Sequence, residues 1–327
     1  MRGSVPSYAL FGLLVLVAGR AWALPAPRLR ADTFFEWKTI NERVRVAIGQ
    51  GGNATVVADG GEVVIIDTKN SPFGDVLRRE GTGSGTLKMV INTHHHADHT
   101  GGNHAFTKDV PVLAQEKALP RVASQVNRYI GQIKQAGLEL DKAEEKIKAL
   151  ILEDYKRLDA RKGQLKPEEF MPTEKFGEEK TVTVGGTKLV LKHIGAGHTD
   201  NDAFIFVEGA NVMVTGDLLF YRMHPFIDRD SGATTVGWRE SCRKMLEMCD
   251  AKTVVVPGHG EITDREGIQL QITYFDEVCA QIERLVKDGR KREDARSFVS
   301  PRFSAFGRDQ GRASAFGAIF DELSEKK

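Results

Sequence analysis

The sequence predicts an α/β protein in which two strand-rich halves are separated by a helical insertion. Short apolar runs punctuated by glycine begin at about residue 44, and the same pattern resumes at about residue 181. Between them, residues 117–163 show helical spacing of their apolar side chains instead. With 327 residues and 41% hydrophobic side chains, the chain is long enough to bury one large core.

The first half contains four apolar runs that predict strands, and two of these end at residues with useful chemistry. The third run is apolar throughout, which is typical of a strand buried on both faces, and it ends at Asp67. The fourth run leads into a histidine-rich loop, after which a helix is expected at about Gly102. The expected strands are residues 44–48, 54–57, 63–66 and 87–91.

We interpret residues 117–163 as a helical hairpin inserted between the two halves. The first helix is indicated by apolar side chains at helical spacing, and the second by a capping box formed by Asp141 and Glu144. The polar face of the hairpin is rich in Lys and Glu, which suits either a solvated surface or a lid. The apolar positions of the first helix are Leu119, Val122, Val126, Ile130 and Ile133.

The second half repeats the strand pattern and adds two helices, expected over residues 238–248 and 264–287. Residues 291–327 are expected to form a partly helical C-terminal tail, in which Phe316 and Phe320 mark a packing face. The expected strands are residues 181–184, 188–191, 203–207, 212–214 and 253–256.

Residues 1–23 match a secretory signal peptide. Arg2 precedes an uncharged apolar run from Tyr8 to Ala18, and Ala21-Trp22-Ala23 supplies a small-x-small cleavage site. The run is too short to span a bilayer comfortably, so we expect cleavage, no stable membrane insertion afterwards, and a secreted or periplasmic protein.

The net charge narrows the class of partners that we expect. The net charge of +1 gives no reason to expect a nucleic-acid partner, and a small-molecule substrate is expected instead.

Three cysteines cannot all pair within one chain, and Cys242 and Cys249 lie too far apart on the predicted helix to form a disulfide. We therefore expect Cys242, Cys249 and Cys279 to be buried and unpaired.

Four histidines within six residues predict a metal site in the loop after the fourth strand. Neutral imidazole and carboxylate are natural ligands of Zn²⁺. In an extended stretch His94 and His96 point to the same side, whereas His95 points away and is not expected to be a ligand. Asp98 and His99 follow at a turn, where they can face a second ion beside the first.

The segment Thr93-His94-His95-His96-Ala97-Asp98-His99-Thr100-Gly101-Gly102-Asn103 resembles the signature of the metallo-β-lactamase-fold hydrolases, and is most similar to the glyoxalase II branch. The resemblance implies a four-layered αβ/βα sandwich, here over residues 24–290. Further motifs follow in the family's order. They are Asp67, Gly197-His198-Thr199, Thr215-Gly216-Asp217-Leu218 and Pro257-Gly258-His259-Gly260.

The resemblance also implies a dinuclear ligand set. His94, His96 and His198 would hold the first metal, Asp98, His99 and His259 the second, and Asp217 would bridge them. The expected cofactor is two zinc ions per chain, with iron or manganese as other options. Asp67, Thr199 and Asp202 are expected to orient ligands rather than to bind metal.

The implied activity is hydrolysis in which a metal-bridging hydroxide attacks the carbonyl of an ester, thioester, lactone or lactam. Asp98 would orient the hydroxide and pass its proton to the leaving group. Tyr221 and His224 are candidates to donate to an oxyanion, with loop packing as the other interpretation of both. Arg222 is the nearest cation that could hold a lactam carboxylate, because Leu218, Leu219 and Phe220 carry no charge.

Three alternatives remain at this point. A β-lactamase would use the same centre on one class of lactam. A mononuclear iron sulfur dioxygenase would reuse the first histidines on the same fold, and metal analysis would separate it from a dinuclear zinc enzyme. A binding or chaperone-like protein without turnover usually has a broken ligand set, whereas all seven ligands are present here.

Overall fold

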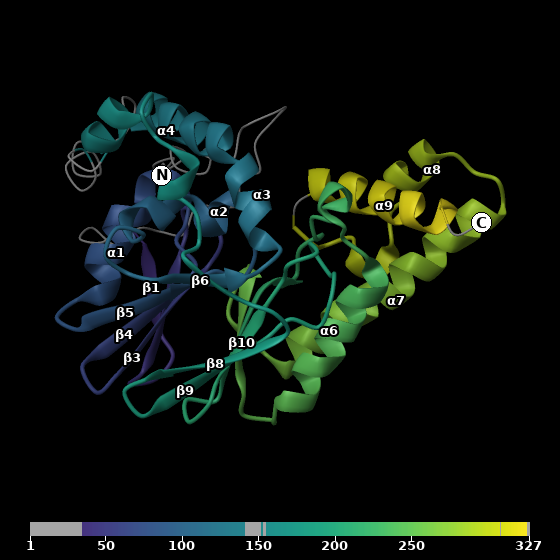
Figure 1. Cartoon of the computed structure of the whole chain (residues 1–327). Helices are drawn as coiled ribbons and strands as arrows, with labels where there is room; N and C mark the ends of the chain where they lie inside the picture. Colours follow the sequence, from purple (N-terminus) through teal and green to yellow (C-terminus); the bar gives the residue numbers. More distant parts are fainter. Residues whose placement is uncertain (1–34, 141–151, 153–154, 308, 326–327) are drawn as a thin grey trace, which may run out of the picture.

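The computed structural model describes residues 35–140, 152, 155–307 and 309–325 (Figure 1). The expected signal peptide and the capping box of Asp141 and Glu144 lie outside these residues. Within them, no helix is both long and apolar enough to cross a membrane.

Two mixed sheets form the centre of the fold. The first runs in sequence order, antiparallel from β1 to β4 and parallel from β4 to β7. Its strands are β1 (Glu36–Thr39), β2 (Val44–Ile48), β3 (Ala54–Asp59), β4 (Glu62–Ile66), β5 (Thr86–Ile91), β6 (Val112–Gln115) and β7 (Glu174–Phe176).

The second sheet is antiparallel except for the pair β11 and β12, which is parallel. Its order is β13-β12-β11-β10-β9-β8. The strands are β8 (Glu179–Val184), β9 (Thr187–Lys192), β10 (Phe204–Val207), β11 (Val212–Phe220), β12 (Val254–His259) and β13 (Thr263–Asp264).

Helices cover the outer face of each sheet, so the predicted four-layered αβ/βα sandwich is confirmed (Figure 1). On the first sheet lie α1 (Gly74–Thr82), the short α2 (Ala97–Thr100) and the inserted helices. On the second sheet lie α6 (Thr235–Met248) and α7 (Arg265–Lys287).

The strand β4 shows why its sequence is apolar throughout. Val64 and Ile66 are buried between the two sheets, and Val63 and Ile65 are buried under α1. Because side chains alternate across a strand, covering both faces makes every position of such a strand apolar. The prediction of a strand buried on both faces is confirmed.

The helical insertion lies between β6 and β7, not between the two halves of the fold. The sequence-based placement was wrong because β7 is only three residues long and leaves little pattern to detect. The described helices of the insertion are α3 (Ala118–Ser124), α4 (Val126–Leu140) and residues 155–161. Together with Ala97 of α2 they bury a small hydrophobic cluster of their own.

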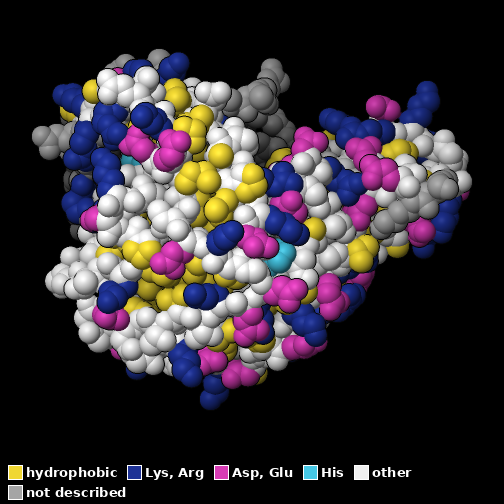
Figure 2. Space-filling model, viewed as in Figure 1, with side chains coloured by type: hydrophobic (Ala, Val, Ile, Leu, Met, Phe, Trp, Pro, Cys, Tyr) yellow, Lys and Arg dark blue, Asp and Glu magenta, His cyan; other side chains and the backbone are white. Residues whose placement is uncertain are grey.

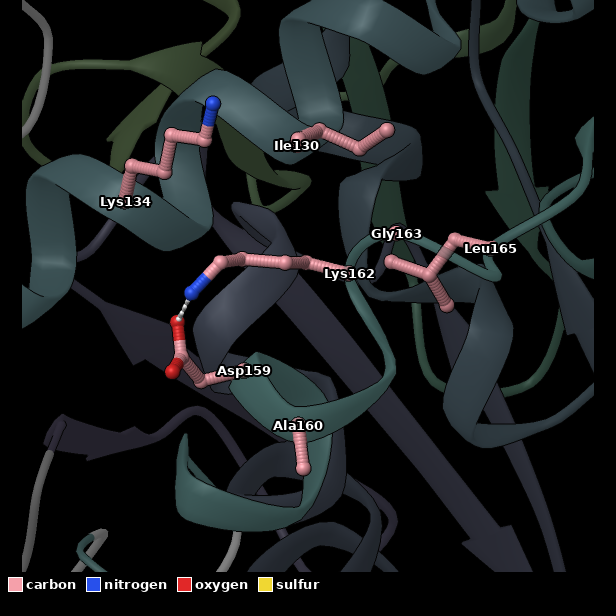
Figure 3. Close-up of a pocket in the computed structure, with 7 residues that line it drawn as sticks. All are labelled: Ile130, Lys134, Asp159, Ala160, Lys162, Gly163 and Leu165. Carbon is pink, nitrogen blue, oxygen red and sulfur yellow. Dashed lines mark hydrogen bonds and ion pairs between the residues drawn. The ribbon is translucent and has the colours of Figure 1, made fainter.

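A hollow of about 650 Å³ lies on this insertion (Figure 3). Two of its lining residues, Lys162 and Asp159, form an ion pair. All seven lining residues come from α4 or from the segment between residues 159 and 165, and none is a predicted metal ligand.

The described residues after 290 pack against the domain. The helices α8 (Arg292–Ser297) and α9 (Asp309–Ser324) pack against α7, and Phe316 is fully buried in the cluster that they share with the second sheet. The predicted packing role of Phe316 is therefore confirmed.

All three cysteines are free, as expected, although Cys249 is half-buried rather than buried. On the face shown in Figure 2, Lys and Arg side chains are interspersed with Asp and Glu, apart from a group of Lys and Arg at the upper left.

Candidate metal centre

The seven predicted ligands meet where strands of both sheets end. His94 and His96 lie in the loop after β5, and Asp98 and His99 lie in the short helix α2. The other three come from the second sheet: His198 from the loop after β9, Asp217 from β11 and His259 from the last position of β12.

An irregularity in β11 aims Asp217 at the histidines. The register between β11 and β12 shifts on both sides of Gly216, which has a φ of 51°. A bulge of this kind bends the strand and re-aims the next side chain. A Cβ at Gly216 would lie 2.6 Å from Thr93, so glycine also permits the close approach of the two loops.

The first group of potential ligands consists of His94, His96, His198 and Asp217, whose ligand atoms all lie within 4.8 Å of one another. The Nε2 atom of His198 is 2.9 Å from Nδ1 of His96 and 3.4 Å from Oδ2 of Asp217. Such a set of three imidazoles and one carboxylate suits a tetrahedral Zn²⁺ ion.

The second group consists of Asp98, His99 and His259. The Nε2 atom of His259 lies 3.2 Å from Oδ2 of Asp98, and both histidines approach Asp217 as well. His99 Nε2 is 3.1 Å from Asp217 Oδ1, and His259 Nε2 is 3.4 Å from Asp217 Oδ2. Asp217 thus reaches both groups, as the bridging interpretation requires.

In three of the histidines, the ring nitrogen that faces away from the centre has a hydrogen-bond acceptor. His99 Nδ1 donates to Oδ2 of Asp67 at 2.7 Å, and His198 Nδ1 donates to the carbonyl of Phe226 at 2.7 Å. His94 Nδ1 lies 3.1 Å from the hydroxyl of Thr93. These bonds fix the tautomers in which the other nitrogen is free to bind a metal.

His96 is oriented by Asp228, which sequence reasoning missed. Its Nε2 atom donates to Oδ2 of Asp228 at 2.8 Å, which leaves Nδ1 for the metal. His95, His96 and Asp228 also lie close enough to one another to form a third group. Because His95 instead bonds to Asn201 and Ser231, we interpret this group as support for His96.

The donor atoms fit a metal centre. Among the described residues, His94 Nε2, His99 Nε2 and Asp217 Oδ1 are buried side-chain atoms that make no hydrogen bond of acceptable geometry, although the last two lie 3.1 Å apart. Buried polar atoms are normally satisfied, so three such atoms converging on one point call for a ligand. Imidazole and carboxylate donors make that ligand a metal ion.

The pKa values of two histidines of the first group are lowered, whereas those of the two histidines of the second group are raised. Burial lowers the pKa of His94 well below its ordinary value and that of His198 to about 3, so both rings stay neutral and able to bind metal. For His99 and His259, burial acts in the same direction, but carboxylates led by Asp217 outweigh it and raise both pKa values.

We expect metal binding by the second group to release protons at neutral pH. The raised pKa values of His99 and His259 mean that the metal-free rings keep their protons to higher pH, and a metal must displace them. Affinity should rise with pH through these pKa values. Calorimetric titration of zinc at pH 7, in buffers of different ionisation enthalpy, measures the release; heats independent of the buffer would contradict the expectation.

The insertion contacts the metal-ligand loop directly. The hydroxyl of Tyr129 lies 2.9 Å from that of Thr100, which in turn bonds to the carbonyl of His95. Gln125 Nε2 donates to the same carbonyl at 3.1 Å. Tyr129 is fully buried and its ring stacks on that of Phe170, with 4.4 Å between the centroids, so packing holds the tyrosine hydroxyl in place.

Other side chains of the insertion bond to two further loops of the centre. Arg121 forms a bidentate ion pair with Asp200, two residues after His198, with an Nε–Oδ1 distance of 2.8 Å. Gln132 Nε2 donates to Oδ1 of Asn70 at 2.8 Å. The described part of the insertion therefore braces the two loops that carry His96 and His198, and also the loop after β4, which favours a supporting role over a lid.

The structure places the two predicted oxyanion donors differently. Tyr221 lies beside the second group, because its backbone N–H donates to the carbonyl of His259 at 3.0 Å. His224 is buried among aromatic rings of the C-terminal helices, and its Nδ1 atom lies 3.0 Å from the hydroxyl of Tyr274. Those contacts give His224 a packing role; oxyanion donation by Tyr221 or His224 stays a prediction.

Residues 47–259 match the family model described as the Metallo-beta-lactamase superfamily. The chain belongs to the metallo-beta-lactamase superfamily. Over 65 residues it is 35% identical to "Probable metallo-hydrolase YybB" of Bacillus subtilis, covering 19% of this chain and 30% of that protein. Over 99 residues it is 25% identical to "Metallo-beta-lactamase type 2" of Bacteroides fragilis, covering 30% of this chain and 40% of that protein. The matches thus span less than half the length of these curated relatives.

Solved superfamily structures share the fold. A metallo-beta-lactamase from Pontibacter korlensis superposes with a TM-score of 0.55 at 18% identity, covering 74% of this chain and 99% of that one. The DIM-1 metallo-beta-lactamase superposes with a TM-score of 0.53 at 16% identity, covering 74% and 97%. About a quarter of this superfamily member lies outside both superpositions.

Proposed function

We propose that this protein is an exported dinuclear zinc hydrolase with a glyoxalase II-like ligand set, which acts on the carbonyl of an ester, thioester, lactone or lactam. One observation carries the proposal: two groups of potential ligands share Asp217, and every histidine of the first group has its outward nitrogen engaged. The signal-like residues 1–23 support export.

Two zinc ions held by these groups would supply Lewis acidity and a hydroxide at neutral pH. The exposure of the candidate ligands indicates from which side a substrate can reach the centre. Asp98 and His259 are 25% and 15% exposed, whereas the side chain of Asp217 is 3% exposed. The open side of the centre therefore lies at the second group, where a substrate carbonyl can enter.

Asp98 stands at this open side and is the residue best placed to hold and move a proton. One of its oxygens, Oδ2, faces His259 and His99, at 3.2 Å and 3.7 Å from their Nε2 atoms. A carboxylate held in this way can orient an attacking water with one oxygen and carry its proton towards the leaving group.

We expect β-lactam turnover to be weak or absent, although several relatives are named as metallo-beta-lactamases. Leu218, Leu219 and Phe220 are buried in β11 and offer no charge to a lactam carboxylate. Arg222 is exposed, and its guanidinium lies over the ring of Tyr221 at 5.3 Å. We expect kcat/KM well below the roughly 10⁴ to 10⁸ M⁻¹s⁻¹ of dedicated enzymes. Steady-state assays of a penicillin, a cephalosporin and a carbapenem with zinc present decide this, and efficient turnover of any one would contradict it.

A turnover screen of the zinc-loaded mature chain tests the proposed function. Esters, thioesters, lactones and phosphodiesters are assayed together, with oxygen uptake followed in the presence of a thiol persulfide. The proposal expects hydrolysis of at least one carbonyl substrate that is lost on chelation. Turnover of phosphodiesters alone, or oxygen uptake by an iron-loaded protein, would replace it with another activity of the fold.

A further inference from the structure

A buried lysine lies next to the second metal group and serves no metal directly. Lys69 is fully buried after β4, and its ammonium donates to two backbone carbonyls, of Ala47 at 2.6 Å and of Gly52 at 2.7 Å. The ring of Phe35 lies 5.3 Å from the same ammonium. The two carbonyls belong to the end of β2 and to the β2–β3 loop, residues 49–53, so Lys69 fastens this loop to the end of β4.

The β2–β3 loop is packed on the residues of the second group. The N–H of Gly52 donates to the carbonyl of Asp98 at 3.1 Å. A Cβ at Gly52 would lie 2.1 Å from Cε1 of His99, so the loop backbone lies directly against that imidazole.

The same loop also holds the strand end that carries His259. The N–H of Asn53 donates to the carbonyl of Gly258 at 2.8 Å. Its side-chain Nδ2 donates to the carbonyls of Pro257 and Gly260, at 2.9 Å and 3.0 Å. All three residues of the second group, Asp98, His99 and His259, therefore have this loop as a neighbour.

Backbone strain gathers at the same place. Five non-glycine residues of the described chain have a positive φ, and three of them are Gln50, Asp67 and Lys69, with φ values of 61°, 63° and 70°. Such conformations are costly and persist only where the surroundings enforce them, most often at functional sites. The hydrogen bonds of the Lys69 ammonium tie the two strained segments together, alongside two bonds from Asn70 to the carbonyl of Gln50.

The ammonium is also costly to bury. Desolvation lowers the pKa of Lys69 to about 7, although Asp67 and Asp98 act in the opposite direction. A methionine would fill much the same space without this cost, so the charge and its donors, rather than the volume, account for a lysine here.

We propose that Lys69 is a positioning residue for the second metal. By fastening the β2–β3 loop, it holds Asp98, His99 and His259 in the relative positions that binding the second metal requires. The inference rests on the dinuclear centre proposed above. It assigns to Lys69 a selective effect on the second metal, because the loop contacts the second group through these bonds and the first group is held by Asp228, Thr93 and the Phe226 carbonyl.

The test compares the full-length mature protein with its Lys69→Met variant in two measurements. In the metal-free protein, hydrogen exchange of residues 48–56 should become faster in the variant, because the carbonyls of Ala47 and Gly52 lose their bonds to the ammonium and the loop is held less firmly. In chelator competition with zinc, the second dissociation constant should rise by about 10- to 100-fold, as is usual when a residue that supports a ligand is lost. The first constant should change much less.

Val207→Ala is the matched control, because Val207 is fully buried in β10, away from the centre. It should lower the melting temperature and leave both zinc constants unchanged. The proposal is overturned if Lys69→Met alters neither exchange nor zinc binding, or if it weakens both metals equally, as general destabilisation would.

A second variant keeps the test decisive if Lys69→Met does not fold. Asn53→Ala opens the other end of the loop by removing two bonds, and it should weaken the second metal selectively; unchanged zinc binding would also overturn the proposal. Should the wild-type protein bind one metal only, the dinuclear proposal fails, and hydrogen exchange still decides whether Lys69 fastens the loop.

Discussion

Asp98→Asn should remove most of the catalytic turnover, on the order of 100-fold or more, while leaving the fold intact. Burial works against ionisation of Asp98, but His99 and His259 outweigh it and hold the pKa of its carboxyl well below the usual value. The side chain is therefore a carboxylate at any working pH. Asparagine has the same size but no charge, so it can neither bind the second metal well nor accept a proton.

The comparison is made on kcat with the best substrate from the turnover screen, with zinc in excess. Asp59→Asn serves as control, since Asp59 accepts hydrogen bonds from Gly186 and Thr187 in a turn of the sheets. The control should keep its rate within about twofold, as surface substitutions away from a site usually do. Near wild-type rates with Asp98→Asn would show that another group moves the proton.

Gly258→Ala should abolish metal binding at the shared position and most activity with it. A Cβ at Gly258 would lie 2.0 Å from Oδ1 of Asp217 and 2.6 Å from the backbone of Gly216, and neither can yield without moving the Asp217 carboxylate. A displacement of about 1 Å at a reacting centre can cost roughly 100-fold in rate. The alanine acts only through space, because it leaves every ligand in place.

Gly131→Ala is the matched control, since a Cβ at Gly131 in α4 would meet no atom within 4 Å. It should bind zinc normally and gain roughly 0.5–1 kcal/mol of stability, because alanine is the better helix former. Zinc content and circular dichroism of both variants are the measurements. Wild-type zinc content in Gly258→Ala would mean that Asp217 does not occupy a shared position.

The sequence predicted the seven candidate ligands in two ways: local spacing indicated those of the histidine-rich loop, and the family resemblance implied His198, Asp217 and His259. Four of them occupy one short loop, where alternation alone sends His94 and His96 to one side. Each of the other three follows a glycine, and the structure brings all seven together. The strands were predictable for a similar reason: β-branched runs such as Val63–Ile66 identify themselves by composition.

The supports of the ligands were not predictable, because they come from distant parts of the chain. Asp228 lies 132 residues after His96, and no spacing rule connects them. Nothing in the sequence distinguishes Lys69 from a surface lysine, and only the structure shows that it is buried and bonded to a carbonyl of β2. The placement of the insertion failed for the opposite reason, because a strand as short as β7 is fixed by its pairing with β6 and not by its own sequence.

The metal content of the purified mature protein tests the central claim most directly. Two groups of potential ligands share one carboxylate, so elemental analysis after zinc loading and removal of excess metal should give about two zinc ions per chain. The protein should bind them without any change in fold. A reproducible value of one metal per chain, unchanged by added zinc, would contradict the dinuclear account.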